Sequence, residues 1–150
     1  MNVRVALFAT LLVPSVWAQH PVTIPRQGLA YRQLPGVDPN LLALDVYEPT
    51  PAPAQPAPVM VYVHGGAWRT GDKRQVVRDK IRFFNRAGWV FVSVNYRLSP
   101  TEIPDNPADL NPTRVKFPDH NQDAAAAGAW VLQSIWHFGG NPSEICLLGL

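Results

Sequence analysis

The sequence predicts an α/β domain in which helices cover both faces of a mostly parallel sheet. Three short apolar segments, 59–63, 89–94 and 145–148, have the length and composition of buried strands. Segments 72–87 and 119–138 lie between them and carry apolar residues at helical spacing. The order strand, helix, strand, helix, strand requires right-handed crossovers, which make the strands parallel.

Composition limits the class of protein. The 150 residues are 47% hydrophobic and 16% charged, which is enough apolar material for one folded domain. The net charge of +2 is too small to indicate nucleic acid or an anionic membrane surface as a partner. The sequence has no metal-ligand spacing and no glycine-rich phosphate loop, so we expect no cofactor.

The first residues have the pattern of a secretory signal peptide. Arg4 precedes an apolar core at 5–13, and Val16-Trp17-Ala18 is a small-x-small cleavage site. The core is too short to span a bilayer as a helix. We expect cleavage after Ala18, a secreted or periplasmic protein without a stable membrane anchor, and one domain over 19–150. An uncleaved anchor or a buried strand is the alternative.

The front of this domain is predicted to be an antiparallel hairpin. Segments 28–34 and 41–47 are its strands, and the turn-forming residues 35–40 join them. Five prolines follow within 48–58, which predicts a stiff, extended connector inside the same domain.

The helix over 72–87 is predicted to begin with Asp72 as its N-cap and to end at Gly88. Its buried face would be formed by Val77, Ile81 and Phe84. The basic residues between Lys73 and Arg86 then belong to a solvated helix face.

The second helix opens at Pro118-Asp119, after an irregular segment over 97–116. Gly139-Gly140 is predicted to end the helix. Its apolar stripe is formed by Ala124, Ala127, Val131, Ile135 and Phe138. We expect Asp119 to cap this helix, Asp123 to pair with a neighbouring loop, and His120 and His137 to be exposed. Cys146 is the only cysteine, which precludes an internal disulfide, and it is expected to be buried in the last strand.

The segment most informative about function follows the strand 59–63. It reads His-Gly-Gly-Ala-Trp, and its glycines allow backbone N–H groups to approach a ligand closely. Preorganised N–H donors of this kind stabilise the oxyanion of an acyl-transfer intermediate. His64 is interpreted as a loop-holding residue. Trp68 is expected to pack under the loop or to wall the acyl pocket, and Tyr96 to brace the loop with its hydroxyl.

Four segments in order resemble the exported esterase and hormone-sensitive-lipase-like branch of the α/β-hydrolase superfamily. The loop at 64–68 resembles its His-Gly-Gly-x-Trp motif, and Asn-Tyr-Arg-Leu-Ser-Pro at 95–100 is similar to its following segment. Phe-Pro-Asp at 117–119, with the alanine-rich helix, and Gly-Gly-Asn-Pro at 139–142 continue the resemblance, which covers about residues 40–150.

The resemblance implies the α/β-hydrolase fold and a carboxylic-ester hydrolase activity. The oxyanion donors would be backbone N–H groups of Gly65, Gly66 and Ala67, chiefly the last two. The family serine lies in Gly-x-Ser-x-Gly, of which Gly149 would be the first glycine and Leu150, an unusual residue there, the second position. We therefore expect an N-terminal portion of the domain that stops before the nucleophile and lacks the triad. Small-molecule or polysaccharide-linked esters are the expected substrates.

Other functions are compatible with the same residues. Formamidases and serine peptidases of this fold carry similar motifs. A non-catalytic binding module with an α/β-hydrolase-like fold is a second class. A third possibility is that the 150 residues alone form an inactive, aggregating fragment with its last strand as a bare sheet edge.

Overall fold

The computed structural model describes residues 25–100 and 115–149. Its strands are β1 (Arg26–Ala30), β2 (Ala43–Tyr47), β3 (Ala57–Val63), β4 (Val90–Val94) and β5 (Gly140–Gly149). The α-helices are α1 (Arg78–Arg86) and α2 (Asp119–Ser134), and the 3-10 helices are η1 (Pro39–Leu42) and η3 (Ile135–Phe138). The expected signal peptide, most of the segment 97–116 and Leu150 lie outside the described residues.

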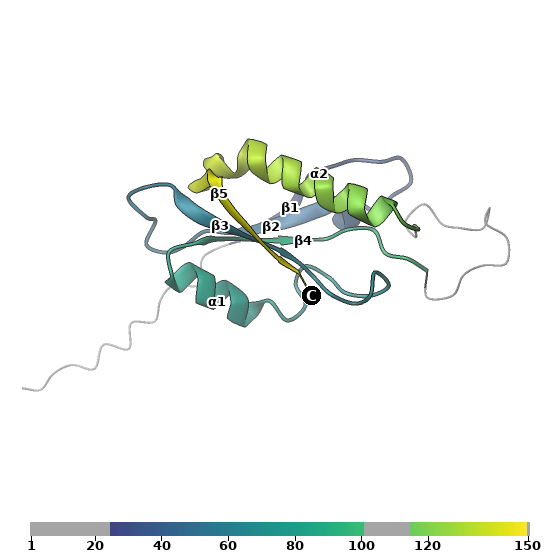
Figure 1. Cartoon of the computed structure of the whole chain (residues 1–150), viewed down its shortest axis with the longest axis horizontal. Helices are drawn as coiled ribbons and strands as arrows, with labels where there is room; N and C mark the ends of the chain where they lie inside the picture. Colours follow the sequence, from purple (N-terminus) through teal and green to yellow (C-terminus); the bar gives the residue numbers. More distant parts are fainter. Residues whose placement is uncertain (1–24, 101–114, 150) are drawn as a thin grey trace, which may run out of the picture.

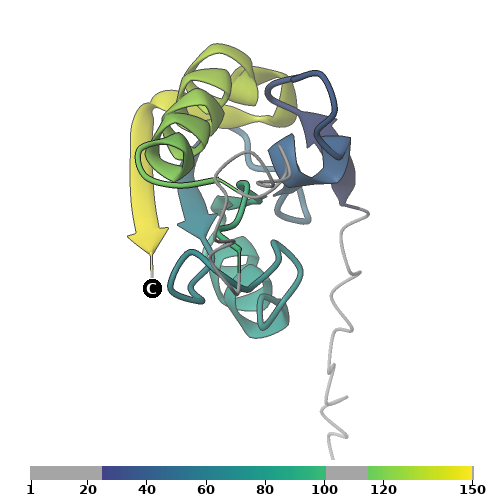
Figure 2. The same ribbon diagram turned by 90° about the vertical axis from the view of Figure 1, so that its right-hand side faces the viewer.

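The strands form one sheet in the order β1-β2-β4-β3-β5. β3 pairs in parallel with both β4 and β5, whereas β2 pairs antiparallel with β1 and with β4. Helix α2 covers one face of the sheet and α1 the other (Figure 1). Viewed along the sheet, β5 and β1 lie on opposite sides of the molecule (Figure 2). The predicted α/β class is confirmed, and the sheet is mixed.

The uninterrupted apolar run in β3 is explained by cores on both faces of the sheet. Val59 and Val61 belong to the cluster under α2, while Met60 and Tyr62 contact the cluster under α1. Successive side chains of a strand point to opposite faces, so every position in β3 is apolar. A sheet covered on both faces places the loop after β3 at the end of a rigid, buried strand.

Helix α1 begins six residues after the predicted start. Asp72 does not cap it: Oδ1 accepts a hydrogen bond from the N–H of Arg74 at 2.8 Å, and Oδ2 accepts one from Nδ2 of Asn95 at 3.1 Å. Val76 has a φ of 54°, which interrupts helical backbone. Lys73 is fully buried, so its assignment to a solvated helix face is wrong.

Helix α2 begins at Asp119 as predicted, but Asp119 makes no capping hydrogen bond. Its carboxylate instead lies 3.6 Å from Nη2 of Arg97. His120 is only 4% exposed, which contradicts the expectation of an exposed ring, whereas His137 is exposed. The apolar stripe is confirmed by the buried side chains of Ala127, Val131 and Ile135, and Gly139 terminates η3 with a φ of 72°.

Two further expectations need correction. Cys146 lies in a strand, but it is exposed. It pairs with Met60 on the α1 face of the sheet, in the edge strand β5. The front hairpin is antiparallel as predicted, although β1 ends at Ala30 and a 3-10 turn precedes β2. Among the described residues, no helix combines the length and apolarity needed to cross a membrane.

Candidate active site

The loop after β3 and the segment after β4 meet at one edge of the sheet. β3 and β4 are parallel neighbours, with Val63 paired to Val94. Their carboxyl ends therefore lie side by side, and ligands of open α/β sheets bind at this edge. This topology brings the loop 64–68 against Tyr96, as the sequence interpretation requires.

The loop turns sharply through three residues with positive φ: Gly66 (119°), Ala67 (51°) and Trp68 (63°). The carbonyl of Gly66 accepts hydrogen bonds from the N–H groups of Arg69 and Thr70. A Cβ on Gly66 would lie 2.1 Å from the carbonyl oxygen of Thr70, so only glycine fits there. Non-glycine residues in this region cost about 1–2 kcal/mol each, which the surrounding contacts must offset.

Gly66 and Ala67 are exposed, and within the described part of the chain their N–H groups donate to no acceptor. Successive backbone N–H groups in a turn of this kind form an anion-binding concavity. The loop can therefore offer bare donors to a negatively charged oxygen, which is the chemistry predicted for Gly65, Gly66 and Ala67.

His64 is buried beneath this turn and packs against Tyr96. The Tyr96 hydroxyl donates to the carbonyl oxygen of His64 at 2.8 Å and lies 3.3 Å from its Nδ1. The two rings stack at 4.4 Å. Burial lowers the pKa of His64, outweighing the opposite effects of the Gly65 carbonyl and Asp72. An enclosed imidazole whose charged form is disfavoured suits a residue that holds the loop.

Trp68 closes the turn and is 44% exposed. Its carbonyl oxygen accepts a hydrogen bond from the N–H of Ser99 at 2.6 Å. Its ring lies 5.1 Å from that of Tyr96, edge to face, and 5.3 Å from that of His120. The indole thus contacts two buried rings while the residue remains partly exposed, so it both supports the loop and reaches the surface beside it.

Sequence reasoning missed Gly71, which the loop also requires. With a φ of 111°, a Cβ at this position would lie 2.3 Å from Nδ1 of His64 and 2.6 Å from the carbonyl oxygen of Gly65. The only local signal was the turn-forming pair Gly71-Asp72.

A buried polar network behind the loop was also missed. The side-chain oxygen of Asn95 accepts from the N–H of Lys73 at 2.6 Å, and its Nδ2 donates to the carbonyl of Asn40 at 3.0 Å. The ammonium group of Lys73 donates to the side chain of Asn40 and lies 3.9 Å from the buried carboxylate of Asp45. These contacts fix the segment that leaves the loop.

Asp123 has the partner that the sequence could not identify. Its carboxylate accepts from Nε of Arg97 at 2.7 Å and from Nη2 at 2.9 Å, and Arg32 lies 3.2 Å away. Hydrogen bonding to Asp123 raises the pKa of Arg97. The pair joins the segment after β4 to the first turns of α2.

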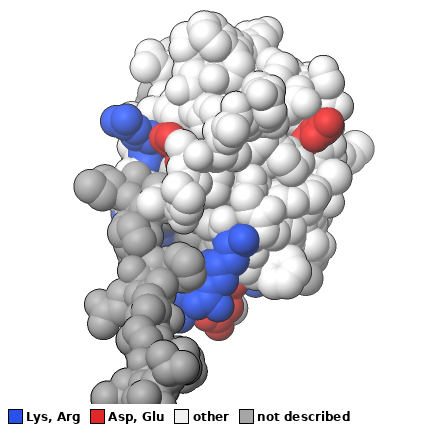
Figure 3. Space-filling model, turned by 90° about the vertical axis from the view of Figure 1, so that its left-hand side faces the viewer, with Lys and Arg blue, Asp and Glu red and all other residues white. Residues whose placement is uncertain are grey.

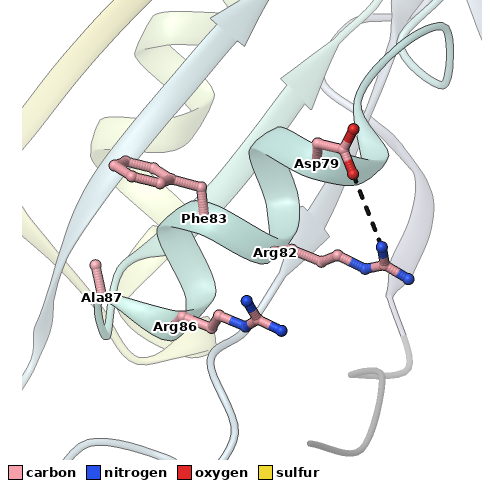
Figure 4. Close-up of a pocket in the computed structure, with 5 residues that line it drawn as sticks. All are labelled: Asp79, Arg82, Phe83, Arg86 and Ala87. Atoms are coloured by element: carbon pink, nitrogen blue, oxygen red, sulfur yellow. Dashed lines mark ion pairs between the residues drawn. The ribbon is translucent and has the colours of Figure 1, made fainter.

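A surface hollow elsewhere contains none of the candidate residues. It lies along α1 and is lined by Asp79, Arg82, Phe83, Arg86 and Ala87 (Figure 4). One side of the molecule carries scattered charges of both signs amid mostly uncharged surface (Figure 3). Among the described residues, no group of three or more His, Cys, Asp or Glu side chains could hold a metal ion.

Comparison with known proteins gives consistent matches. The model of the carboxylesterase family matches residues 18–150. Esterase LipQ of Mycobacterium tuberculosis is 35% identical over 116 residues, or 77% of this chain and 24% of LipQ. Para-nitrobenzyl esterase of Bacillus subtilis is 31% identical over 124 residues, or 81% of this chain and 24% of that protein.

The fold has close structural counterparts. The propionate-bound esterase Est2 of Thermogutta terrifontis superposes with a TM-score of 0.62 at 25% identity, covering 87% of this chain and 42% of Est2. The chain spans about a fifth to a quarter of the length of the curated relatives it matches.

Proposed function

Because the chain belongs to the carboxylesterase family, we propose that it forms the oxyanion-binding part of a serine carboxylic-ester hydrolase. The observation that carries this proposal is the turn at Gly66 and Ala67. Its two exposed N–H groups donate to no acceptor among the described residues. They follow a buried parallel strand, at the edge of the sheet where such folds place their ligands.

The reaction uses these donors when the ester carbonyl is attacked. As a serine oxygen bonds to the carbonyl carbon, negative charge collects on the former carbonyl oxygen, and N–H groups fixed beforehand stabilise it. Removing one such donor from a complete site costs about 3–4 kcal/mol of transition-state stabilisation. The 150 residues contain no Gly-x-Ser-x-Gly sequence, so the nucleophile of this proposal is not among them.

We propose short-chain acyl esters as the substrate class. Trp68 is partly exposed beside the loop, and in this proposal its indole would limit the length of the acyl chain. The structurally similar Est2, at 25% identity, has propionate bound, which supports a small acyl group. Acetyl or feruloyl groups on polysaccharides have the same ester chemistry and remain the alternative class of substrate.

The test uses the protein expressed from its complete reading frame. Hydrolysis of p-nitrophenyl acetate, butyrate and decanoate is measured, and a serine-reactive fluorophosphonate followed by mass spectrometry identifies the nucleophile. We expect faster turnover of acetate and butyrate than of decanoate, with loss of activity on labelling. A folded protein that neither hydrolyses these esters nor takes up the label would instead be a non-catalytic binding module.

We also propose that the protein is exported, which the pattern at Arg4 and Val16-Trp17-Ala18 supports. Expression in a secreting host followed by N-terminal sequencing tests this. The mature protein is expected to begin at Gln19. A mature form that begins at Met1 or Asn2 would contradict export through a cleaved signal peptide.

A further inference from the structure

Ser99 and His120 form a contact beside the loop that the proposed reaction does not yet use. The backbone N–H of Ser99 donates to the carbonyl oxygen of Trp68 at 2.6 Å. The side chain of Ser99 shares a hydrogen bond of 3.0 Å between its Oγ and Nε2 of His120. A residue of α2 is therefore connected to the end of the oxyanion loop through one intervening side chain.

The loop is held in this way at both of its ends. Tyr96 donates its hydroxyl proton to the carbonyl of His64, where the loop begins, and Ser99 donates to the carbonyl of Trp68, where the turn closes. The ring centroids of Tyr96 and His120 lie 5.1 and 5.3 Å from that of the Trp68 indole. The exposed N–H groups lie between these two fixed points.

His120 is placed to act as a support and not as a reacting group. Its side chain is buried, and its Nε2 is engaged by Oγ of Ser99. The first turns of α2 that carry it are anchored through Asp123, which accepts three hydrogen bonds from Arg97. The His120 ring therefore belongs to a part of α2 that is held in place.

We infer that His120 is a positioning residue for the oxyanion loop, acting on Trp68 through Ser99. This inference rests on the proposed esterase function of the loop. Misplacing a catalytic group by about 1 Å can lower a rate by about a hundredfold. Loosening one end of a loop that is still held at the other end should have a smaller effect, which we expect to fall on kcat.

The test compares four single variants, and the double variant that combines His120→Phe with Ser99→Ala, in the protein expressed from its complete reading frame. His120→Phe keeps the ring but removes the hydrogen bond, Ser99→Ala removes the other partner, and His120→Gln supplies an amide nitrogen in place of Nε2. His137→Gln, at an exposed histidine of η3, is the matched control. Ester hydrolysis and hydrogen exchange of the amides in 65–70 are measured for each.

We expect His120→Phe and Ser99→Ala to lower kcat about tenfold with KM within about twofold. Amide exchange in 65–70 should rise in both, and the double variant should be no worse than either single one. His120→Gln should recover most of the rate, and His137→Gln should match the parent. Unchanged exchange in 65–70 and unchanged kcat in His120→Phe would overturn the inference.

The two proposals fail in different ways. A parent protein without esterase activity refutes the proposed function, while the exchange of the loop amides still decides whether His120 holds the loop. If His120→Phe does not fold, Ser99→Ala and His120→Gln carry the comparison. Equal losses in Ser99→Ala and His120→Gln, without faster loop exchange, would show that the histidine contributes only to packing.

Discussion

Arg97 and Asp123 form a buried ion pair that joins the end of β4 to α2. The guanidinium donates from Nε at 2.7 Å and from Nη2 at 2.9 Å, and the backbone N–H of Arg97 adds a third hydrogen bond at 3.2 Å. Asp123 is fully enclosed. The pair thus links the segment after β4, which continues to Ser99, with the first turns of α2.

Replacing Asp123 by Asn should therefore be strongly destabilising. The substitution leaves the buried guanidinium of Arg97 with only the partly exposed carboxylate of Asp119, 3.6 Å from Nη2, as a counter-charge. Removing one member of a buried pair costs about 3–5 kcal/mol of unfolding free energy. Urea unfolding followed by circular dichroism measures this. The matched control is Asp79→Asn, because Asp79 pairs with Arg82 at the surface at 3.8 Å. Its effect should stay below about 1 kcal/mol, and similar losses in the two variants would contradict the prediction.

Gly71→Ala should disrupt the loop more than Gly88→Ala does. Both glycines have positive φ, of 111° and 81°, so alanine costs about 1–2 kcal/mol at either position. At Gly71 the new Cβ would also collide with His64 and Gly65, whereas at Gly88 nothing lies within 4 Å. We expect an additional loss of about 1–3 kcal/mol and a fall in ester hydrolysis for Gly71→Ala alone. Equal thermal unfolding midpoints for the two variants would show that the loop adapts to the added methyl group.

Tyr96→Phe isolates the hydrogen bond at the start of the loop. The ring stacking on His64 is retained, but the donor to its carbonyl oxygen is lost. A buried acceptor left without its partner costs about 1–3 kcal/mol, and kcat should fall as well. Tyr62→Phe is the control, since Tyr62 is also buried and no partner of its hydroxyl is seen among the described residues. The control should change stability by less than about 0.5 kcal/mol.

The stability of the protein should fall as the pH drops below about 6.5. Burial lowers the pKa of both His64 and His120 in the folded state. Around His120, Asp119 and Asp123 act in the opposite direction, and Arg97 reinforces the effect. At pH values between the folded and the unfolded pKa, the unfolded chain binds more protons than the folded one. The unfolding free energy therefore increases with pH in this range and decreases on acidification.

Denaturant unfolding between pH 5 and 7 tests this sign. His120→Gln should flatten the slope of unfolding free energy against pH, because it removes one of the two buried imidazoles. His137→Gln, at an exposed histidine, is the matched control. A parent protein whose stability increases toward pH 5 would contradict the lowered pKa of the two buried rings.

The sequence predicted those features that depend on the local pattern of residues. The run at 59–63 predicted a strand buried on both faces, and the glycines of the loop predicted the turn. It failed where distant residues decide. Asp72 has the composition of a helix cap, but Asn95 and the Arg74 amide occupy its carboxylate. The helical spacing of Lys73 predicts a solvent-exposed side chain, but its ammonium group is buried, where it contacts the side chains of Asn40 and Asp45.

The same distinction explains the errors on α2 and β5. His120 lies among polar neighbours in the sequence, and only the position of Ser99 shows why its ring is buried. Cys146 sits in an apolar strand, yet exposure depends on which side of β5 the helices cover. Asp123 was expected to find a partner, and its identification required the three-dimensional path of the segment after β4.

The position of β4 between β2 and β3 also affects how the chain can be made. A polypeptide that emerges from a ribosome or a secretion pore in order from its N-terminus presents β2 first and β3 next. These strands are not neighbours, so neither finds its central partner until residues 90–94 have appeared. Throughout that interval the apolar segment 57–63 lacks both of its partner strands, β4 and β5, and an unpaired apolar strand of this kind is prone to aggregation.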